Sequence, residues 1–88
     1  MLKSGIDKLR ILFFANLREQ LGLEVMELND FSGRTIADVR RYLIQRYPEW
    51  EIFFERKLLC SLNHKLASLE DSVFPNDEIA FFPMVTGG

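Results

Sequence analysis

One amphipathic helix, in residues 33–48, most constrains how this chain can fold. The sequence GRTIADVRRYLIQRYP places Thr35 at a helix N-cap position and Asp38 three residues later, which predicts a capping box. Apolar side chains recur at helical spacing along one stripe: Ile36, Val39, Leu43 and Tyr47. The residue before a proline avoids the α region, so we expect the helix to end by Tyr47 and to bury its stripe against another element.

Two segments typical of strands precede this helix. Residues 8–15 (KLRILFFA) alternate in polarity and are apolar enough that we expect a strand buried on both faces. Residues 23–30 (LEVMELND) form a weaker strand, which could pair antiparallel with the first. We expect the connection, NLREQLG, to be a single helical turn or a loop closed by Gly22.

After the helix, residues 49–56 carry aromatic side chains at helical spacing and predict a further short turn. Residues 57–68 (KLLCSLNHKLAS) alternate around a polar tip at Asn63 and His64, which predicts a hairpin. A proline-bearing loop follows, and the segment EIAFFPMV predicts a last strand.

The expected order is therefore β-β-α-β-β in a chain of 88 residues, which is long enough for one domain, spanning residues 1–88. The first and last strands are the most apolar, and such strands occupy the middle of a sheet. A ferredoxin-like fold needs a second full helix, for which residues 68–77 are too short and too rich in turn formers. The prediction is an α+β β-grasp, or ubiquitin-like, fold with one main helix across a mixed sheet.

Composition and charge exclude several classes of function. The chain is 48% hydrophobic with a formal net charge of -2, so it has no basic field for nucleic acid or an anionic membrane. We interpret the pair Arg40 and Arg41 as part of a solvated helix face. The start MLKSGIDK lacks the apolar core of a signal peptide, and a single cysteine is typical of the cytoplasm.

The C-terminal sequence DEIAFFPMVTGG is the strongest functional signal. Strand alternation sends Phe81 and Phe82 to opposite faces, so we expect one of them to lie away from the core and mark a docking surface; the alternative is that both are core. Pro83 keeps the preceding residue extended, so a tail from about residue 83 leaves the sheet pointing outward. Gly87 and Gly88 lack Cβ atoms and can enter a channel too narrow for side chains.

A terminal carboxylate has a pKa near roughly 3.5 and is a poor electrophile, so it needs activation before it can react. An ATP-dependent partner that forms an acyl-adenylate would supply this activation. Adenylation would then allow the end of the chain to be loaded with a new atom.

Other chemically suggestive residues have simpler interpretations. Cys60 alternates with two leucines, as a small buried hydrophobe would, and one cysteine beside His64 does not make a metal site. Asp77 and Glu78 leave opposite faces of a strand beside a turn, so we expect them to hydrogen-bond that turn. No nucleophile–base combination or phosphate loop is present in the sequence, and we predict no intrinsic catalysis and no bound cofactor or metal.

Three segments, ILFFANLREQLG, SLNHKLAS and DEIAFFPMVTGG, make the chain resemble the small subunits of molybdopterin synthase, the MoaD family of ubiquitin-like sulfur carriers. The resemblance covers nearly the whole chain, and the terminal motif is its specific part.

The resemblance implies that a ubiquitin-activating-like adenylyltransferase uses ATP to adenylate Gly88, and that a sulfur donor protein then converts it to a thiocarboxylate. Thr86 and Gly87 belong to the tail, which would enter the large synthase subunit and deliver sulfur to cyclic pyranopterin monophosphate. The complex would be a heterotetramer, with the acid and base residues on the large subunit. For docking, the resemblance points to Phe14, Leu66 and Phe82, with Arg18 as a polar contact.

Three alternatives share the expected fold. A thiamine-pathway sulfur carrier and a small protein modifier both end in two glycines and differ in their partners. A β-grasp interaction module with inert glycines would not gain sulfur at all.

Overall fold

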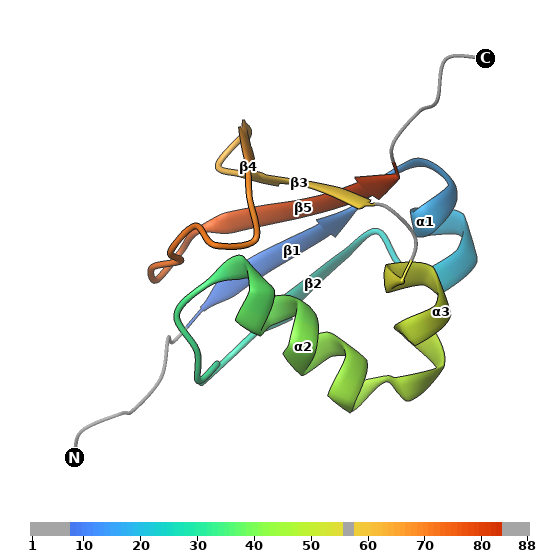
Figure 1. Cartoon of the computed structure of the whole chain (residues 1–88), viewed down its shortest axis with the longest axis horizontal. Helices are drawn as coiled ribbons and strands as arrows, with labels where there is room; N and C mark the ends of the chain where they lie inside the picture. Colours follow the sequence, from blue (N-terminus) through green and yellow to red (C-terminus); the bar gives the residue numbers. More distant parts are fainter. Residues whose placement is uncertain (1–7, 56–57, 84–88) are drawn as a thin grey trace.

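The computed structural model describes residues 8–55 and 58–83, which contain a five-stranded mixed sheet in the order β2-β1-β5-β3-β4 (Figure 1). The strands are β1 (Leu9–Phe13), β2 (Val25–Leu28), β3 (Leu58–Leu62), β4 (Lys65–Ala67) and β5 (Glu78–Pro83). β1 pairs antiparallel with β2 and parallel with β5, and β3 pairs antiparallel with β4 and β5. The two most apolar strands therefore lie next to each other inside the sheet, as the sequence predicts.

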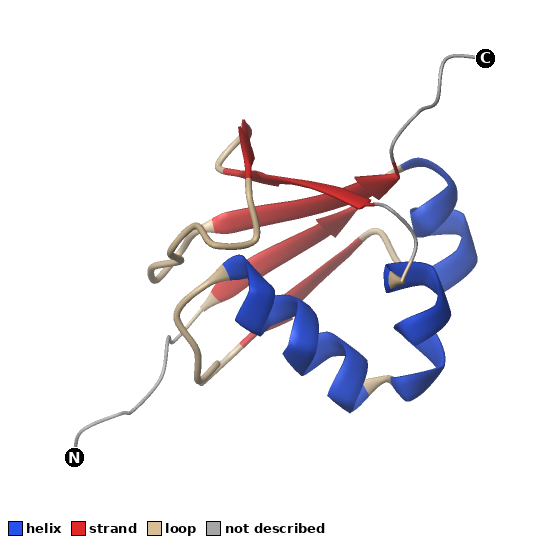
Figure 2. Cartoon of the chain, in the orientation of Figure 1, coloured by secondary structure: helices blue, strands red, loops and turns tan. Residues whose placement is uncertain are grey.

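The helices are α1 (Ala15–Leu21), α2 (Ile36–Arg46), the 3-10 turn η1 (Pro48–Trp50) and α3 (Glu51–Phe54). Figure 2 shows α2 lying across one face of the sheet, with α1 and α3 near the end at which β1 and β5 terminate. This arrangement of a mixed sheet under one main helix is the predicted β-grasp.

The core lies between the sheet and α2. Its fully buried members alternate along the two central strands and recur at helical spacing on α2: Leu9, Ile11, Phe13, Ile79, Ile36, Val39 and Leu43. Aromatic rings close one end of the core, where Phe13 meets Trp50 edge-on at 5.7 Å and Phe54 meets Phe81 edge-on at 5.4 Å between ring centroids. Each fully buried side chain of this size contributes roughly 1.5–3 kcal/mol, so this layer is the main source of stability.

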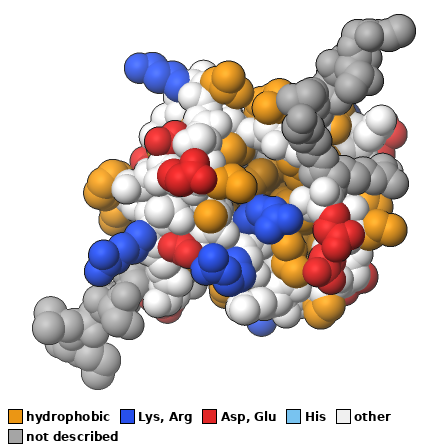
Figure 3. All heavy atoms as spheres, in the orientation of Figure 1, with side chains coloured by type: hydrophobic (Ala, Val, Ile, Leu, Met, Phe, Trp, Pro, Cys, Tyr) orange, Lys and Arg blue, Asp and Glu red, His pale blue; other side chains and the backbone are white. Residues whose placement is uncertain are grey.

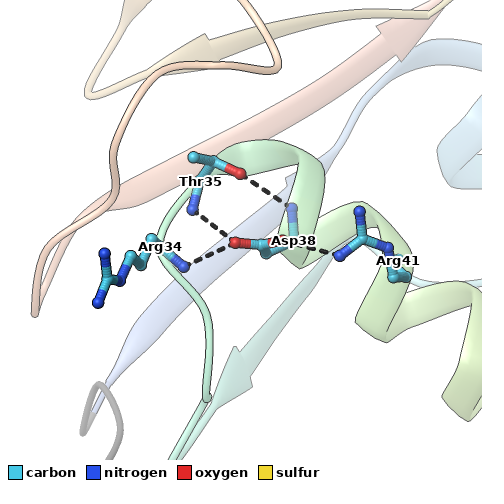
Figure 4. A network of polar contacts seen from close by, with 4 residues as sticks. All are labelled: Arg34, Thr35, Asp38 and Arg41. Carbon is cyan, nitrogen blue, oxygen red and sulfur yellow. Dashed lines mark hydrogen bonds and ion pairs between the residues drawn. The ribbon is translucent and has the colours of Figure 1, made fainter.

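The predicted capping box at the start of α2 is confirmed (Figure 4). The Asp38 backbone N–H donates to the Thr35 hydroxyl at 3.3 Å, and the Asp38 carboxylate accepts from the Thr35 N–H at 3.1 Å. The same carboxylate accepts from the Arg34 N–H at 2.8 Å and pairs with Arg41 at 2.9 Å. The Arg34 and Thr35 backbone donors, followed by Arg41, hold the pKa of Asp38 below its ordinary value. The helix ends at Arg46, with Tyr47 as its C-cap, in agreement with the prediction that it ends by Tyr47.

Two expectations for the N-terminal half are wrong. The connection after β1 is the seven-residue helix α1, not a single turn, although Gly22 ends it with a left-handed φ of 68° as predicted. β1 is buried on one face only: no described helix covers its other face, where Arg10 is exposed and Leu12 is half-buried. The second half agrees better with the sequence, since β3 and β4 form the expected hairpin with Asn63 and His64 at its tip, both with positive φ.

Candidate docking face and C-terminal site

The residues predicted to carry the chemistry, Thr86, Gly87 and Gly88, lie outside the described residues, as does the predicted tail beyond Pro83. The structure bears on them through β5, which ends at Pro83 and lies between β1 and β3. Both edges of β5 are paired with neighbouring strands, so the last described residues before the two glycines belong to the centre of the sheet.

The two phenylalanines of β5 occupy different environments. Phe81 lies in the core and is 1% exposed, whereas Phe82 points to the opposite face and is half-buried. The alternative that both rings are core is therefore wrong: Phe82 is outside the core cluster. Its cross-strand partner on β3 is Leu59, which is also half-buried.

The face of the sheet away from α2 carries a mainly apolar surface, interrupted by Ser61 on β3, which we call the open face. Residues paired across strands share a face, and one row runs Val25, Leu12, Ala80, Ser61, Leu66 through all five strands. The next row pairs Leu59 with Phe82. The open face is thus defined by six apolar residues: Leu12, Val25, Leu59, Leu66, Ala80 and Phe82. Leu66 is its most exposed member, at 74%.

α1 brings two further predicted residues beside this surface. The Phe14 N–H donates to the carbonyl of Phe81 at 3.3 Å, which holds the start of α1 against β5, and the Phe14 ring is 42% exposed. Arg18 lies one helical turn later, and its backbone N–H donates to the Phe14 carbonyl. Its guanidinium is 3.9 Å from the Glu24 carboxylate. The start of α1, with Phe14, therefore lies against the C-terminal half of β5, and Arg18 follows one turn along the same helix.

A charged band bounds the open face at its other end. Arg10 lies 3.9 Å from Glu27 and 3.7 Å from Glu78, and His64 Nε2 lies 2.9 Å from Glu78 Oε1. Arg10 pairs with Glu27 and Glu78 across the strands, directly beside the row of Leu12. Exposed ion pairs contribute little to stability, so we interpret this band as a polar boundary to the apolar surface.

The remaining candidates have structural roles. Cys60 is buried, and its thiol donates to the Ala67 carbonyl at 3.4 Å. Burial, with smaller contributions from Asp71 and Glu70, raises the pKa of the Cys60 thiol, which makes it unreactive.

Asp77 accepts from the Phe74 N–H and from Asn63, so the predicted turn-binding role is confirmed for Asp77. Glu78 instead forms the ion pairs of the charged band.

The helix-covered side differs from the open face. Figure 3 shows Lys, Arg, Asp and Glu side chains interspersed with hydrophobic ones on this side. A hollow of about 400 Å³ lies there between α2, α3 and β3, with Arg40, Phe54 and Leu58 among its lining residues. Arg41 is exposed as predicted, but Arg40 is half-buried and donates to the Phe54 carbonyl at 3.0 Å. Arg40 therefore links α2 to α3 in addition to facing solvent.

Sequence reasoning missed part of the open face. Leu12, Leu59 and Val25 were not singled out, because alternation says which residues share a face but not which face the helices cover. The available signal was the pairing of β1 with β5. In the observed register of that pair, Leu12 lies opposite Ala80.

Residues 8–55 and 58–83 contain no group of three or more His, Cys, Asp or Glu side chains placed to hold a metal ion. Within the same residues, every helix is too short or too polar to cross a membrane.

The family model and the most similar curated proteins agree on one family of relatives. The sequence model of the ThiS family matches residues 11–88. The chain is 44% identical over 81 residues to the molybdopterin synthase sulfur carrier subunit of Haemophilus influenzae, covering 91% of this chain and 99% of that protein. It is 37% identical over 82 residues to the molybdopterin synthase sulfur carrier subunit of Escherichia coli, with the same coverage of 91% and 99%.

Solved structures share the fold at lower sequence identity. SAMP1 from Haloferax volcanii superposes with a TM-score of 0.76 at 24% identity, covering 92% of this chain and 99% of that one. A putative molybdopterin converting factor, subunit 1, from Pyrococcus furiosus gives a TM-score of 0.72 at 17% identity, covering 90% and 99%. These likenesses confirm the β-grasp fold.

Proposed function

This chain belongs to the ThiS family, among the sulfur carrier subunits of molybdopterin synthase, and on that premise we propose that Gly88 is the residue that carries the sulfur. Its α-carboxyl group is adenylated, converted to a thiocarboxylate and then used to deliver sulfur. The observation that carries this proposal is the position of β5. Residues 78–83, the last ones described before the two glycines, form the central strand of the sheet, so the body of the domain can present its end to a partner.

The proposed chemistry takes place in four steps. A carboxylate oxygen of Gly88 attacks the α-phosphorus of ATP on an activating enzyme, which releases pyrophosphate and leaves an acyl-adenylate. The outer sulfur of a donor-protein persulfide then attacks the carbonyl carbon and displaces AMP, which leaves an acyl disulfide between Gly88 and the donor. A second thiol of the donor attacks the donor's own sulfur in that disulfide, which releases the thiocarboxylate and leaves a disulfide on the donor. In the last step the thiocarboxylate sulfur bonds to a carbon of cyclic pyranopterin monophosphate, and water hydrolyses the bond between that sulfur and the Gly88 carbonyl, which restores the carboxylate and leaves the sulfur on the way to the dithiolene of molybdopterin. Thr86 and Gly87, whose side chains are small or absent, belong to the tail that enters the active sites of the activating enzyme and the large subunit.

Three partners follow from this cycle. A subunit of molybdopterin synthase has a large-subunit partner, and we place the acid and base residues of the transfer there, in a heterotetramer. A ubiquitin-activating-like adenylyltransferase and a sulfur donor protein supply the activation and the sulfur. ATP is consumed by the adenylyltransferase, so this chain needs no cofactor of its own, and a cycle driven by ATP fits the cytoplasm.

We propose that the large subunit docks on the open face beside the tail. Phe14, Leu66 and Phe82 supply its apolar contacts, and Arg18 supplies a polar contact at the edge. Two of these side chains are more than 40% exposed, Phe14 at 42% and Leu66 at 74%. Exposed apolar side chains gathered on one face of a small domain are typical of a protein-binding surface.

A protein-modifier role is the second candidate, because the fold is shared with small archaeal modifier protein 1 from Methanosarcina acetivorans at a TM-score of 0.74 and 24% identity. In that role the activated Gly88 would be attacked by a lysine amine and would form an amide with another protein. A thiamine-type carrier would load sulfur in the same way but would pass it to a different acceptor. An inert β-grasp module would do neither.

Intact-mass spectrometry tests the proposal. We expect the full chain, incubated with the activating enzyme, ATP and a sulfur donor, to gain the mass of one oxygen-to-sulfur exchange located at Gly88. A variant lacking Gly88, and one extended by a single residue, should fold normally and support no molybdopterin formation with the large subunit. Normal synthesis by the variant lacking Gly88 would exclude the proposed carrier role, and amide conjugates to lysine would favour the modifier.

A further inference from the structure

A groove at the β1–β2 side of the open face is not used by the docking residues named above. It has a volume of about 440 Å³ and is lined by apolar and charged side chains: Leu12, Val25, Met26, Arg10, Glu24 and Glu27. Val25, on the edge strand β2, is 44% exposed, and Leu12 beside it is half-buried. The groove therefore offers an apolar floor with charged groups at its rim.

The groove is continuous with the open face. Leu12 pairs with Val25 on one side and with Ala80 on the other, and the same row continues through β3 to Leu66. With strands spaced about 4.8 Å apart, this row spans roughly 19 Å. In the other direction, along the strands, the surface changes to the charged band of Arg10, Glu78 and His64. Beyond the end that carries Phe82, the apolar surface can therefore extend from β5 only toward the two sheet edges.

The size of a stable interface requires such an extension. A stable complex buries about 800 Å² on each partner through some 20–30 residues, which Phe14, Leu66, Phe82 and Arg18 alone cannot supply. A brief encounter between a carrier and its activating enzyme needs less area. The large subunit is the lasting partner, so it is the one whose footprint must reach beyond the end of the sheet where the tail leaves.

The rim of the groove indicates the chemistry of the contact. Glu27 on β2 and Glu24 just before β2 are both exposed, and each carboxylate lies 3.9 Å from an arginine, at the limit of an ion pair. Such long, exposed pairs are weak, so both carboxylates keep acceptor capacity for a cation from outside. An apolar floor between two carboxylates fits an apolar side chain that has a lysine or arginine next to it.

We propose that the large subunit inserts an apolar side chain, flanked by a lysine or arginine, into the groove between β1 and β2, so that Val25 is a determinant of partner affinity. This inference rests on the proposed function, and it adds to it a second contact that is remote from the tail.

Binding of the purified large subunit to the full chain tests the groove. We expect Val25→Lys to raise the dissociation constant at least about tenfold, because an apolar contact is replaced by a charge that repels the partner's cation. Ile52→Lys is the matched control: Ile52 is 58% exposed on α3, on the helix-covered side, and its change should leave the affinity within about twofold. Changing Glu24 and Glu27 together to Gln should reduce the salt dependence of binding.

The outcomes separate the two proposals. If the wild-type chain does not bind the large subunit, the proposed function fails. If it binds and Val25→Lys binds equally well, the groove is not part of the interface. A Val25→Lys variant that slows adenylation, or abolishes self-association, while binding the large subunit normally would also overturn the inference, since another partner would occupy the groove. Val25→Thr keeps the β-branched shape; should the lysine variant not fold, an unchanged affinity for the threonine variant contradicts the proposal.

Discussion

Cys60 illustrates how burial decides the chemistry of a single residue in this chain. A thiol in a protein that carries sulfur invites a role in transfer, yet the Cys60 side chain is buried and donates to the Ala67 carbonyl. Removing a thiolate from water is costly, and the carboxylates of Asp71 and Glu70 oppose its negative charge further, so the pKa of Cys60 is raised. The reactive sulfur of the proposed cycle must therefore be held elsewhere.

We predict that Cys60→Ala still gains one sulfur at Gly88 in the activating reaction. The variant should lose about 1 kcal/mol of stability, because a small buried side chain is shortened. Alkylation of Cys60 by iodoacetamide at pH 8 should be at least about tenfold slower in the native protein than in urea, since only the thiolate reacts. Fast native alkylation, or loss of sulfur loading in Cys60→Ala, would give this thiol a direct role.

At this scale the sequence was a good guide wherever the interaction is local. Thr35 and Asp38 are three residues apart, so the capping box depends only on backbone geometry that the helix itself provides. The same holds for Gly22, whose left-handed conformation ends α1. Phe82 was harder, because its exposure depends on which face of the sheet is covered, and this is a property of the whole fold.

Among the elements, α2 carries a titratable group that links its stability to pH. Asp38 accepts from two backbone donors that α2 cannot satisfy internally, and its pKa is lowered by them and by Arg41. A carboxyl whose pKa is lower in the folded state stabilises the protein fully above the unfolded value of 3.8. That contribution is lost as the pH falls from this value through the lower, folded pKa.

We therefore predict that Asp38→Asn is less stable than the wild type at pH 7, and that the two become equally stable as the pH falls well below 3.8. Urea unfolding at a series of pH values measures the difference. Thr35→Ala is the control: it should cost about 1 kcal/mol by removing the other half of the cap, and its deficit should change little with pH. A deficit of Asp38→Asn that is independent of pH would contradict the assignment.

The shortest elements were the least predictable. The sequence predicted a single helical turn or a loop where α1 forms; in the structure α1 has no side-chain cap at its start, and only Leu17 is buried along its seven residues. A helix with one buried side chain leaves almost no periodic pattern in a sequence. Its position is fixed by tertiary contacts instead, including the hydrogen bond from Phe14 to Phe81.

On the scale of the whole molecule, the two faces of the sheet differ: one supports stability, and the other is the face on which we propose that the partner binds. Its covered face holds the core under α2, and its open face presents Leu12, Phe82 and Leu66. The expectation that β1 is buried on both sides was wrong for this reason. Hydrophobicity alone cannot distinguish an apolar residue that packs against a helix from one on an uncovered face of the sheet. The docking that we propose for this face accounts for apolar side chains on a face that no described helix covers.

The adjacent residues Phe81 and Phe82 test this separation directly. We predict that Phe81→Leu loses about 1–2 kcal/mol of unfolding free energy, because it leaves a gap against Phe13 and Phe54 in a packed core. Phe82→Leu should lose less than about 0.5 kcal/mol, since its ring is only half-buried. Urea denaturation measures both.

Binding should show the opposite order. Phe82→Asp, if its fold is intact by circular dichroism, should weaken the affinity for the large subunit at least about tenfold by placing a charge in the apolar contact. Phe81→Leu should bind like the wild type at temperatures where it is folded, because residue 81 faces α3 and the core and not the partner. Retained affinity in a folded Phe82→Asp variant would remove Phe82 from the interface. A large stability loss in Phe82→Leu would show that Phe82 mainly stabilises the sheet. The docking residues of the open face would then include Leu66 and Leu12 but not Phe82.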